Sequence, residues 1–271
     1  MVWPVRVVEV TGSTNADLLE AARGGEAGPT VLAARAQTAG RGRLGRGWQS
    51  APGTSLSVSV LLTPAVPQAA WTWLPVVVGL GVLDALAGLG ARPGTGSGAV
   101  GLKWPNDVVV TDGPGAELGA GPGPVDGART GLAKLAGILA ETTGTPAGPA
   151  VVVGVGVNLA DPDPVPPGGR ATSLQRLLDR PVGADELLPL LEEGLRGRVG
   201  AWERAGGDAA ASGTDAAYRA VCTTLGRRVR ASTPGGVREG TAVDLARDGS
   251  LVLDGPGGRT TVSAGDVEHL R

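Results

Sequence analysis

The sequence predicts an α/β domain followed by a small β domain. Segments with the apolar period of helices alternate with segments of strand period through most of residues 1–222. Beyond Leu225 the strand-like segments become short, and tight turns such as Asp248-Gly249 separate them. The chain has 271 residues, which is enough for one large and one small domain. We therefore expect a larger domain over residues 1–222 and a smaller one over residues 223–271.

Apolar periodicity places the elements of the larger domain. Strands are predicted at residues 7–10, 30–35, 55–62, 108–110, 134–141 and 151–157. Helices are predicted at residues 15–23, 71–89 and 185–204, with a short one around Tyr218 and Cys222. Ser13 or Thr14 can cap the first helix. In residues 55–62 Leu and Val alternate with Ser, and this period of two predicts a strand with one buried face.

The distribution of turn residues predicts the smaller domain and two long loops. Short strands are predicted at residues 228–231, 241–245, 251–253 and 260–262, which together suggest a small β-barrel. Residues 113–131 contain mostly Gly, Pro and Ala without periodicity, and they predict a surface insertion. Residues 161–169 predict a Pro-rich loop.

The composition argues against several classes of site. The formal net charge is −2, so the whole molecule does not point to nucleic acid or to an anionic membrane. Cys222 is the only cysteine, which excludes an internal disulfide and any CxxC pair. His269 is the only histidine and lies two residues from the end, so serine-protease-like triads, HExxH zinc sites and histidine bases are poorly supported.

No secretory signal opens the chain, and its most apolar run predicts a buried helix. That run, residues 73–89, is interrupted by Asp84 and by several glycines, which is not typical of a membrane span. We therefore expect a soluble, cytoplasmic protein with no membrane partner.

The stretch Gln37–Trp48, QTAGRGRLGRGW, is the most unusual part of the sequence. It places Arg41, Arg43 and Arg46 among four glycines and ends on an indole ring. Clustered guanidiniums favour a shared anion, and glycines let backbone N–H groups approach it. One interpretation is a loop that closes over phosphate or carboxylate, with Trp48 stacking on a base. The other is a solvated basic turn, or a segment that binds nucleic acid without sequence preference.

Three further motifs each have a purely structural explanation when taken alone. Ser13-Thr14-Asn15 can be a helix cap, and Lys103–Asp107 (KWPND) can be a turn fixed by its proline. Lys134–Leu139 can be a solvated strand end, and the glycines of Gly154–Asn158 can allow close strand packing. Their occurrence together, in this order with Gln37–Trp48, is far less expected by chance.

In that order the motifs resemble the biotin protein ligase family. The match runs STN, GRGRLGRGW, KWPND, KLAGIL and GVGVN, and then a small C-terminal β domain, so it covers nearly the whole chain. The resemblance implies an α+β fold, in which a mixed-sheet biotin/lipoate ligase-like domain precedes an SH3-like β-barrel. It also implies that biotin and ATP form biotinyl-AMP, with Mg²⁺ accompanying ATP, and that biotin then passes to a lysine of a carboxylase's biotin carboxyl carrier domain.

The resemblance implies roles for individual residues. Biotin binding is implied for Ser13, Thr14, Asn15, Gln37, Arg41, Gly42, Arg43, Lys103, Gly137, Gly154 and Gly156. ATP or adenylate binding is implied for Arg43, Arg46, Trp48, Asn106, Lys134 and Asn158. Catalytic roles are implied for Lys103, as the cation next to the reacting carboxylate, and for Arg43. No metal-ligating residue is implied.

The residue types suit this chemistry. A carboxylate is ionised at neutral pH and can attack the α-phosphate without a general base, so the scarcity of histidine is no obstacle. Lysine and arginine in a dry site can hold two anions together and offset the charge of the transition state. A mobile arginine loop can shield the mixed anhydride from water.

Two alternatives and several open questions remain at this point. A lipoate or octanoate ligase of the same fold is the nearest rival, although a fatty chain needs no polar set such as Ser13, Thr14 and Gln37. A nucleic-acid-binding module using the arginine loop is the rival from another class. Family members that repress transcription carry a winged-helix domain before the STN motif, and the twelve residues before Ser13 are too few for one. We therefore expect no specific DNA partner, while monomer and homodimer both stay open.

Overall fold

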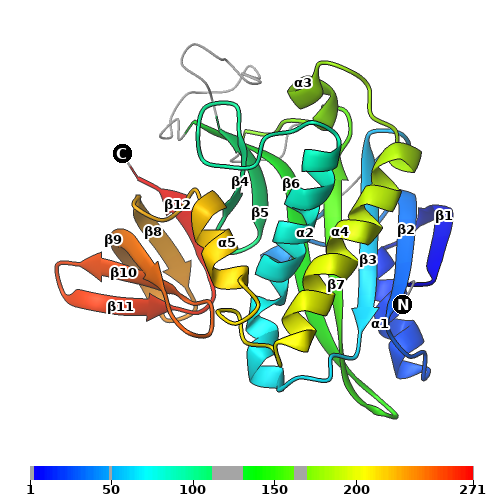
Figure 1. Cartoon of the computed structure of the whole chain (residues 1–271), viewed down its shortest axis with the longest axis horizontal. Helices are drawn as coiled ribbons and strands as arrows, with labels where there is room; N and C mark the ends of the chain where they lie inside the picture. Colours follow the sequence, from blue (N-terminus) through cyan, green and yellow to red (C-terminus); the bar gives the residue numbers. More distant parts are fainter. Residues whose placement is uncertain (1–2, 49–50, 112–130, 162–169, 271) are drawn as a thin grey trace.

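The computed structural model describes residues 3–48, 51–111, 131–161 and 170–270 (Figure 1). The predicted insertion at 113–131 lies outside the described residues except for Gly131. The predicted Pro-rich loop at 161–169 lies outside them except for Asp161.

A seven-stranded mixed sheet forms the centre of the larger domain. In spatial order its strands are β1 (Val5–Thr11), β2 (Thr30–Gln37), β3 (Ser55–Leu62), β7 (Gly148–Asn158), β6 (Leu132–Thr145), β5 (Asp107–Thr111) and β4 (Val100–Lys103). Strands β1 and β2 run parallel, and every other neighbouring pair is antiparallel. The mixed sheet that was predicted is confirmed. The short β4 was not predicted, because four residues that include a glycine carry little periodicity.

Helices cover the sheet on both faces. Helices α2 (Leu74–Gly88) and α4 (Ala184–Arg204) lie side by side across one face, and α1 (Thr14–Arg23) covers part of the other (Figure 1). A Cβ on Gly81 of α2 would lie 2.9 Å from the carbonyl oxygen of Gly194, so glycine lets α2 and α4 approach closely. The remaining helical segments are η1 (Arg43–Gly45), η2 (Gln68–Trp73), α3 (Leu174–Leu178) and α5 (Thr214–Val221).

The apolar segment predicted at residues 71–89 is a helix of the core. Its first turn belongs to the 3₁₀ segment η2, and the α-helix itself begins at Leu74. The stretch Gln68–Gly88 is long and apolar enough to cross a membrane, but most of it is buried inside the protein. Leu80, Leu83 and Leu86 of this helix belong to the main hydrophobic core.

Strand β3 differs from its prediction, because both of its faces are buried. Leu56, Val58 and Val60 face the main core, as expected. Ser57 and Ser59 are also buried, with 2% and 0% of their surface exposed. The alternation of Leu or Val with Ser suggested a solvated second face, but α1 and the segment that follows β2 cover it.

The C-terminal residues form an antiparallel five-stranded sheet, which confirms the small β domain. Its strands are β8 (Arg228–Thr233), β9 (Gly236–Leu245), β10 (Leu251–Gly255), β11 (Gly258–Val262) and β12 (Asp266–His269), in the spatial order β11-β10-β9-β8-β12. The four-residue β12 was not predicted. The buried side chains of this sheet are continuous with the main core.

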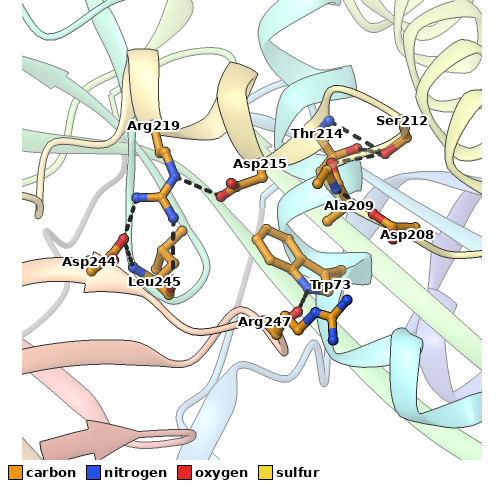
Figure 2. A network of polar contacts seen from close by, with 11 residues as sticks. Trp73, Asp208, Ala209, Ser212, Thr214, Asp215, Arg219, Asp244, Leu245 and Arg247 are labelled. Carbon is orange, nitrogen blue, oxygen red and sulfur yellow. Dashed lines mark hydrogen bonds and ion pairs between the residues drawn. The ribbon is translucent and has the colours of Figure 1, made fainter.

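Polar contacts attach the C-terminal sheet to the larger domain. Arg219 on α5 pairs with Asp215 one helical turn earlier and reaches across to Asp244 on β9 (Figure 2). The indole of Trp73 donates to the carbonyl oxygen of Arg247 over 2.9 Å, in the turn between β9 and β10 (Figure 2). The two sheets are therefore joined by side chains as well as by apolar packing.

Candidate ligand-binding site

Small residues line the face of the sheet that α1 partly covers. Ser57 of β3 lies directly opposite Gly156 of β7, and Gly156 lies opposite Gly137 of β6. Two residues further along β3, Ser59 lies opposite Gly154 of β7. Residues directly opposite one another on paired strands share a face. We call these five residues the small-residue floor, and their size leaves room for a flat group above the sheet.

The Trp48 indole lies on the small-residue floor. A Cβ built on Gly156 would fall 2.4 Å from the indole Cε2, and one on Gly137 would fall 3.5 Å from Cζ3. The ammonium of Lys134 lies 5.7 Å from the centre of the ring, within the range of a cation–π contact. The indole Nε1 and the Ser57 hydroxyl are buried without a hydrogen-bond partner within the described part of the chain. Buried polar atoms of this kind usually have partners, so the pair favours a polar ligand at this place.

A network of polar side chains borders the small-residue floor at the start of α1. The Gln37 Oε1 accepts from the Thr14 backbone N–H over 2.7 Å and from the Thr14 hydroxyl over 3.0 Å. The Ser59 hydroxyl lies 2.7 Å from Thr14 Oγ1 and 2.6 Å from Asn15 Oδ1. Asn15 donates to the Leu139 carbonyl over 3.2 Å. These contacts fix the donor and acceptor directions of the network.

Ser13 has a more local position than the other two residues of the STN motif. It is the N-cap of α1, and its hydroxyl accepts from the Ala16 N–H over 3.4 Å. This satisfies a backbone donor that a helix start leaves without an intrahelical partner. The cap was predicted, and it brings Ser13 beside Thr14 and Asn15 at the border of the small-residue floor.

The arginine loop folds back on itself after β2. Arg41 and Gly47 form an isolated antiparallel bridge, and the Gly42 N–H donates to the Arg46 carbonyl over 2.6 Å. Leu44 at the tip has φ 56 and ψ 33, the left-handed conformation that non-glycine residues rarely adopt. The side chain of Leu44 points outward, with 70% of its surface exposed. Arg43 is half-buried, whereas the side chains of Arg41 and Arg46 are exposed.

Each arginine of the loop contacts a different part of the molecule. Arg43 donates from Nη1 to Asn106 Oδ1 and from Nη2 to the Gly265 carbonyl, both over 3.2 Å. Arg46 pairs with Asp266 at the start of β12. Arg41 lies 3.4 Å from the Glu141 carboxylate of β6. Burial lowers the pKa of Arg43 from its ordinary value.

The KWPND motif forms the hairpin between β4 and β5. Lys103 ends β4, directly opposite Asp107, which begins β5. The Lys134 ammonium forms an ion pair with the Asp107 carboxylate at 2.6 Å. Burial is the main cause that lowers the pKa of Lys103, and Asp107 opposes this shift. Two ammonium groups therefore flank one carboxylate at the edge of the small-residue floor.

The two asparagines that were predicted to bind the nucleotide have different surroundings. Asn106 donates to the Ile138 carbonyl over 2.7 Å and accepts from Arg43, so it links the hairpin to β6 and to the arginine loop. Asn158 is buried, and it donates to the Thr172 carbonyl over 3.0 Å. The side chain of Asn158 therefore holds the chain at the end of β7.

A cleft with a volume of about 600 Å³ opens between the arginine loop, the KWPND hairpin and the turn before β10. Its walls include residues 41–45 of the arginine loop, 104–106 of the hairpin, 138–141 of β6, and 248–250 before β10. The start of α2 closes it with Pro75 and Val76. Both the larger domain and the C-terminal sheet therefore shape this cleft.

The structure thus brings the predicted residues to one region between the start of α1 and the KWPND hairpin. It also adds residues that the sequence analysis did not assign, namely Ser57, Ser59, Asp107, Glu141 and Asp266. The serines were visible as the second half of the alternation in β3. Asp107 is part of the KWPND motif. Glu141 and Asp266 gave no local signal, because their partners lie far away in the sequence.

Comparisons with known proteins agree with this architecture. Residues 7–158 match the sequence profile of the biotin/lipoate A/B protein ligase family, and residues 224–270 match the biotin protein ligase C-terminal domain. The chain is 42% identical over 269 residues to a biotin–[acetyl-CoA-carboxylase] ligase of Mycobacterium tuberculosis, covering 98% of this chain and 88% of that one. It is 33% identical over 262 residues to a ligase of the same name from Paracoccus denitrificans, covering 95% and 97%.

A solved structure shows the same fold. The biotin protein ligase from Aquifex aeolicus in complex with biotin and ATP superposes with a TM-score of 0.73 at 24% identity, over 99% of both chains. This similarity confirms the α+β fold with its small C-terminal domain. On the sequence matches, the chain belongs to the biotin/lipoate A/B protein ligase family and carries the C-terminal domain of biotin protein ligases.

Proposed function

We propose that this protein is an ATP-dependent biotin ligase. It joins biotin and ATP to form biotinyl-AMP and pyrophosphate, and it then transfers biotin to a lysine of a biotin carboxyl carrier domain of a carboxylase. The names of the full-length relatives support this reaction. The observation in the structure that favours it most is the small-residue floor, bordered by a polar network at one end and by lysines and arginines at the other.

Biotin suits the end of the small-residue floor beside α1. Its ureido group has N–H donors and a carbonyl acceptor, and Ser13, Thr14, Asn15 and Gln37 offer partners for both. We also assign Gly137, Gly154 and Gly156 to biotin, because without side chains they let a flat ring approach the sheet beside Trp48 and Asn15. The carboxylate end of biotin then points toward Arg41, Gly42, Arg43 and Lys103. A fatty acyl chain gains nothing from the polar network, which favours biotin over lipoate or octanoate.

ATP suits the opposite end. We assign the nucleotide to Arg43, Arg46, Trp48, Asn106, Lys134 and Asn158, with Trp48 and Asn106 near the adenine. An aromatic face and a cation together favour a base and its phosphates. Arg46 pairs with Asp266 and Lys134 pairs with Asp107, and these ion pairs support the assignment of both cations to the phosphates.

Magnesium accompanies the nucleotide in this proposal. No group of three or more His, Cys, Asp or Glu side chains suited to a metal ion occurs among the residues that the structure describes. Mg²⁺ commonly binds through substrate phosphates with few protein carboxylates, and this donor set fits that mode. Bound there, it supplies charge neutralisation for the phosphate oxygens.

The chemistry needs positioning and positive charge more than proton transfer. The biotin carboxylate is ionised at neutral pH and attacks the α-phosphate, and pyrophosphate leaves. Lys103 offsets the negative charge where the two anions meet, while Arg43 holds the adenylate. The burial that lowers the pKa of Lys103 also strengthens its attraction to an anion, because fewer water molecules screen it.

We also propose the setting in which this enzyme works. Residues 1–222 form the catalytic domain, and residues 223–271 form the SH3-like domain. The protein acts in the cytoplasm, binds no specific DNA sequence and inserts into no membrane, and it works as a monomer or homodimer.

A single labelling experiment tests the proposed function. The protein is incubated with ATP, Mg²⁺, biotin and a purified biotin carboxyl carrier domain, and the carrier is weighed by mass spectrometry. We expect a mass increase of about 226 Da, the mass that an amide-linked biotin adds to lysine. A carrier whose acceptor lysine is replaced by arginine is the matched control and should stay unlabelled. Labelling with lipoate or octanoate in place of biotin would contradict the proposal.

A further inference from the structure

The backbone around Lys103 is held from both sides by two consecutive threonines. On one side, the Thr223 N–H donates to the Leu102 carbonyl over 2.8 Å, and the Thr223 hydroxyl donates to the same oxygen over 3.3 Å. On the other side, the Trp104 N–H donates to Thr224 Oγ1 over 3.0 Å. Both threonines are buried, and they lie in the segment that leads from α5 to β8. Lys103 therefore lies between two fixed peptide groups.

A histidine of the C-terminal sheet completes this arrangement. Thr224 Oγ1 accepts from the Trp104 N–H, so the Thr224 hydroxyl hydrogen remains free to be donated. The Nε2 atom of His269 lies 3.2 Å from the Thr224 hydroxyl, and the two share a hydrogen bond whose direction depends on the imidazole tautomer. Burial and the nearby positive charges of Lys103 and Arg227 lower the pKa of His269 to about 4, so the ring is neutral near pH 7. A neutral imidazole has one donor and one acceptor nitrogen, so Nε2 can pair with the Thr224 hydroxyl in either tautomer.

The side chain of Trp104 is held from the same direction. Its indole Nε1 donates to the Gly249 carbonyl over 3.1 Å, in the turn that forms one wall of the cleft. Trp104 is 3% exposed, so its ring has little freedom to move. Trp104 belongs to the KWPND hairpin, but both of these hydrogen bonds join it to residues that follow α5 in the sequence.

We propose that Thr224 and His269 are positioning residues for the ligase reaction. Together with Thr223 they fix the Leu102 carbonyl and the Trp104 N–H, so that the Lys103 ammonium points at the reacting carboxylate and phosphate. The inference rests on the proposed function, in which Lys103 offsets the charge of the adenylation step. It means that the C-terminal part of the chain acts on the chemistry through a hydrogen-bonded chain of three residues, His269, Thr224 and Trp104.

Two substitutions of Thr224 test this role. Thr224→Val keeps the shape and removes the hydroxyl, which leaves the Trp104 N–H and His269 Nε2 without their partner. We expect kcat for biotin-dependent pyrophosphate release to fall roughly ten- to a hundredfold, since small misplacements of a catalytic group can cost that much. The KM values for biotin and ATP should change little. Thr224→Ser, which keeps the hydroxyl, should restore most of the rate.

The C-terminal sheet should stay attached in these variants, because Arg219 and Trp73 join it to the larger domain elsewhere (Figure 2). Thermal unfolding followed by circular dichroism checks this. If Thr224→Val fails to fold, the pair His269→Gln and His269→Leu replaces it. Glutamine offers an amide that can donate to or accept from the Thr224 hydroxyl, whereas leucine offers neither, so His269→Leu should lose the larger share of kcat.

A double-mutant cycle shows whether Thr224 acts through Lys103. If it does, Thr224→Val should lower kcat much less in a Lys103→Ala background than in the wild type. Equal losses in both backgrounds, or an unchanged kcat in folded Thr224→Val, would overturn the inference. A wild-type protein that fails to label a carrier domain with biotin would instead overturn the proposed function, so the two failures are distinguishable.

Discussion

The indole of Trp48 occupies the space that a side chain on Gly156 would need. A Cβ at Gly156 would come within 2.4 Å of the ring, a distance that unbonded carbon atoms do not reach. The glycine of β7 and the tryptophan at the end of the arginine loop are therefore matched to each other. The position of this ring over the small-residue floor depends on the absence of one methyl group.

Gly156→Ala should displace Trp48 and weaken nucleotide binding. If the indole stacks on adenine, losing its position should raise the KM for ATP by about tenfold, in line with about 1–3 kcal/mol for an aromatic–base stack. The KM for biotin should rise as well, because Gly156 is also assigned to the biotin ring. Gly144→Ala on the neighbouring strand β6 is the matched control, because a Cβ there meets nothing within 4 Å. Equal KM values for ATP in the two variants would refute the stacking role.

Lys103→Ala should cripple adenylation while the fold stays intact. Removing one preorganised charge-stabilising group typically costs about 10²–10³ in rate. Lys103→Arg should rescue little, because a planar guanidinium does not place its charge where an ammonium does. The readout is biotin-dependent pyrophosphate release, and transfer from added biotinyl-AMP should suffer less than the full reaction.

Lys134→Ala is the matched comparison for Lys103, since both ammonium groups lie beside Asp107. We expect a smaller loss of pyrophosphate release in Lys134→Ala than in Lys103→Ala. The reverse order would move the catalytic assignment from Lys103 to Lys134.

Arg43→Gly should uncouple the two halves of the reaction. A charged hydrogen bond to the intermediate, worth about 1.5–3 kcal/mol, is lost, so biotinyl-AMP forms but escapes. Lysines on bystander proteins such as serum albumin should then become labelled, detected with streptavidin. Leu44→Gly controls for loop flexibility, because Leu44 already has a positive φ and its side chain points to solvent. Labelling restricted to the carrier in Arg43→Gly would contradict the role given to this residue.

Replacing residues 113–131 with an Asn-Gly turn should leave ligase activity nearly unchanged. Thr111 and Leu132 are direct partners at the ends of β5 and β6, so Asp112 followed by Asn-Gly can join the two strands in a three-residue turn. The segment contains none of the residues assigned to biotin or ATP. Activity is measured as carrier labelling, with folding checked by thermal unfolding. A folded variant that labels poorly would give this segment a part in shaping the site or in carrier recognition.

His269 should make the protein less stable in mild acid. Its pKa in the folded state is about 4, against an ordinary value of 6.5, so the unfolded chain binds more protons between these pH values. The free energy of unfolding should therefore rise with pH from about 4 to 6.5, and protonation should cost about 2–3 kcal/mol at the acid end. His269→Gln should flatten this part of the profile in urea unfolding. An identical pH dependence in both proteins would show that His269 does not titrate as described.

The sequence predicted the order and type of most long elements, because their apolar periods extend over seven residues or more. It failed for β4 and β12, which have four residues each and too few apolar positions to show a period. It also failed for the second face of β3. Serine at alternate positions occurs both on exposed strand faces and on buried surfaces that bind ligands. The sequence pattern therefore does not show whether other segments cover this face of β3.

The candidate site was predictable only as far as its motifs extend. Each motif is a continuous run, so its glycines and cations could be found by reading along the chain. The partners of those cations could not, since Arg46 and Asp266 are separated by 220 residues. Thr224 and His269 gave no signal for the same reason. Their contact with Trp104 exists only once the C-terminal sheet has packed beside the hairpin.

The ion pairs within the site affect which anions can bind there. Arg41, Arg46 and Lys134 each have a carboxylate of the same chain, on Glu141, Asp266 and Asp107. A polyanion that merely touches this surface therefore meets cations whose charge is already balanced, and it gains little from long-range attraction. A ligand has to offer better geometry than these carboxylates before it can replace them. Glycine-arginine sequences that bind RNA rely on unbalanced charge, and here two of the three loop arginines, Arg41 and Arg46, are paired with carboxylates.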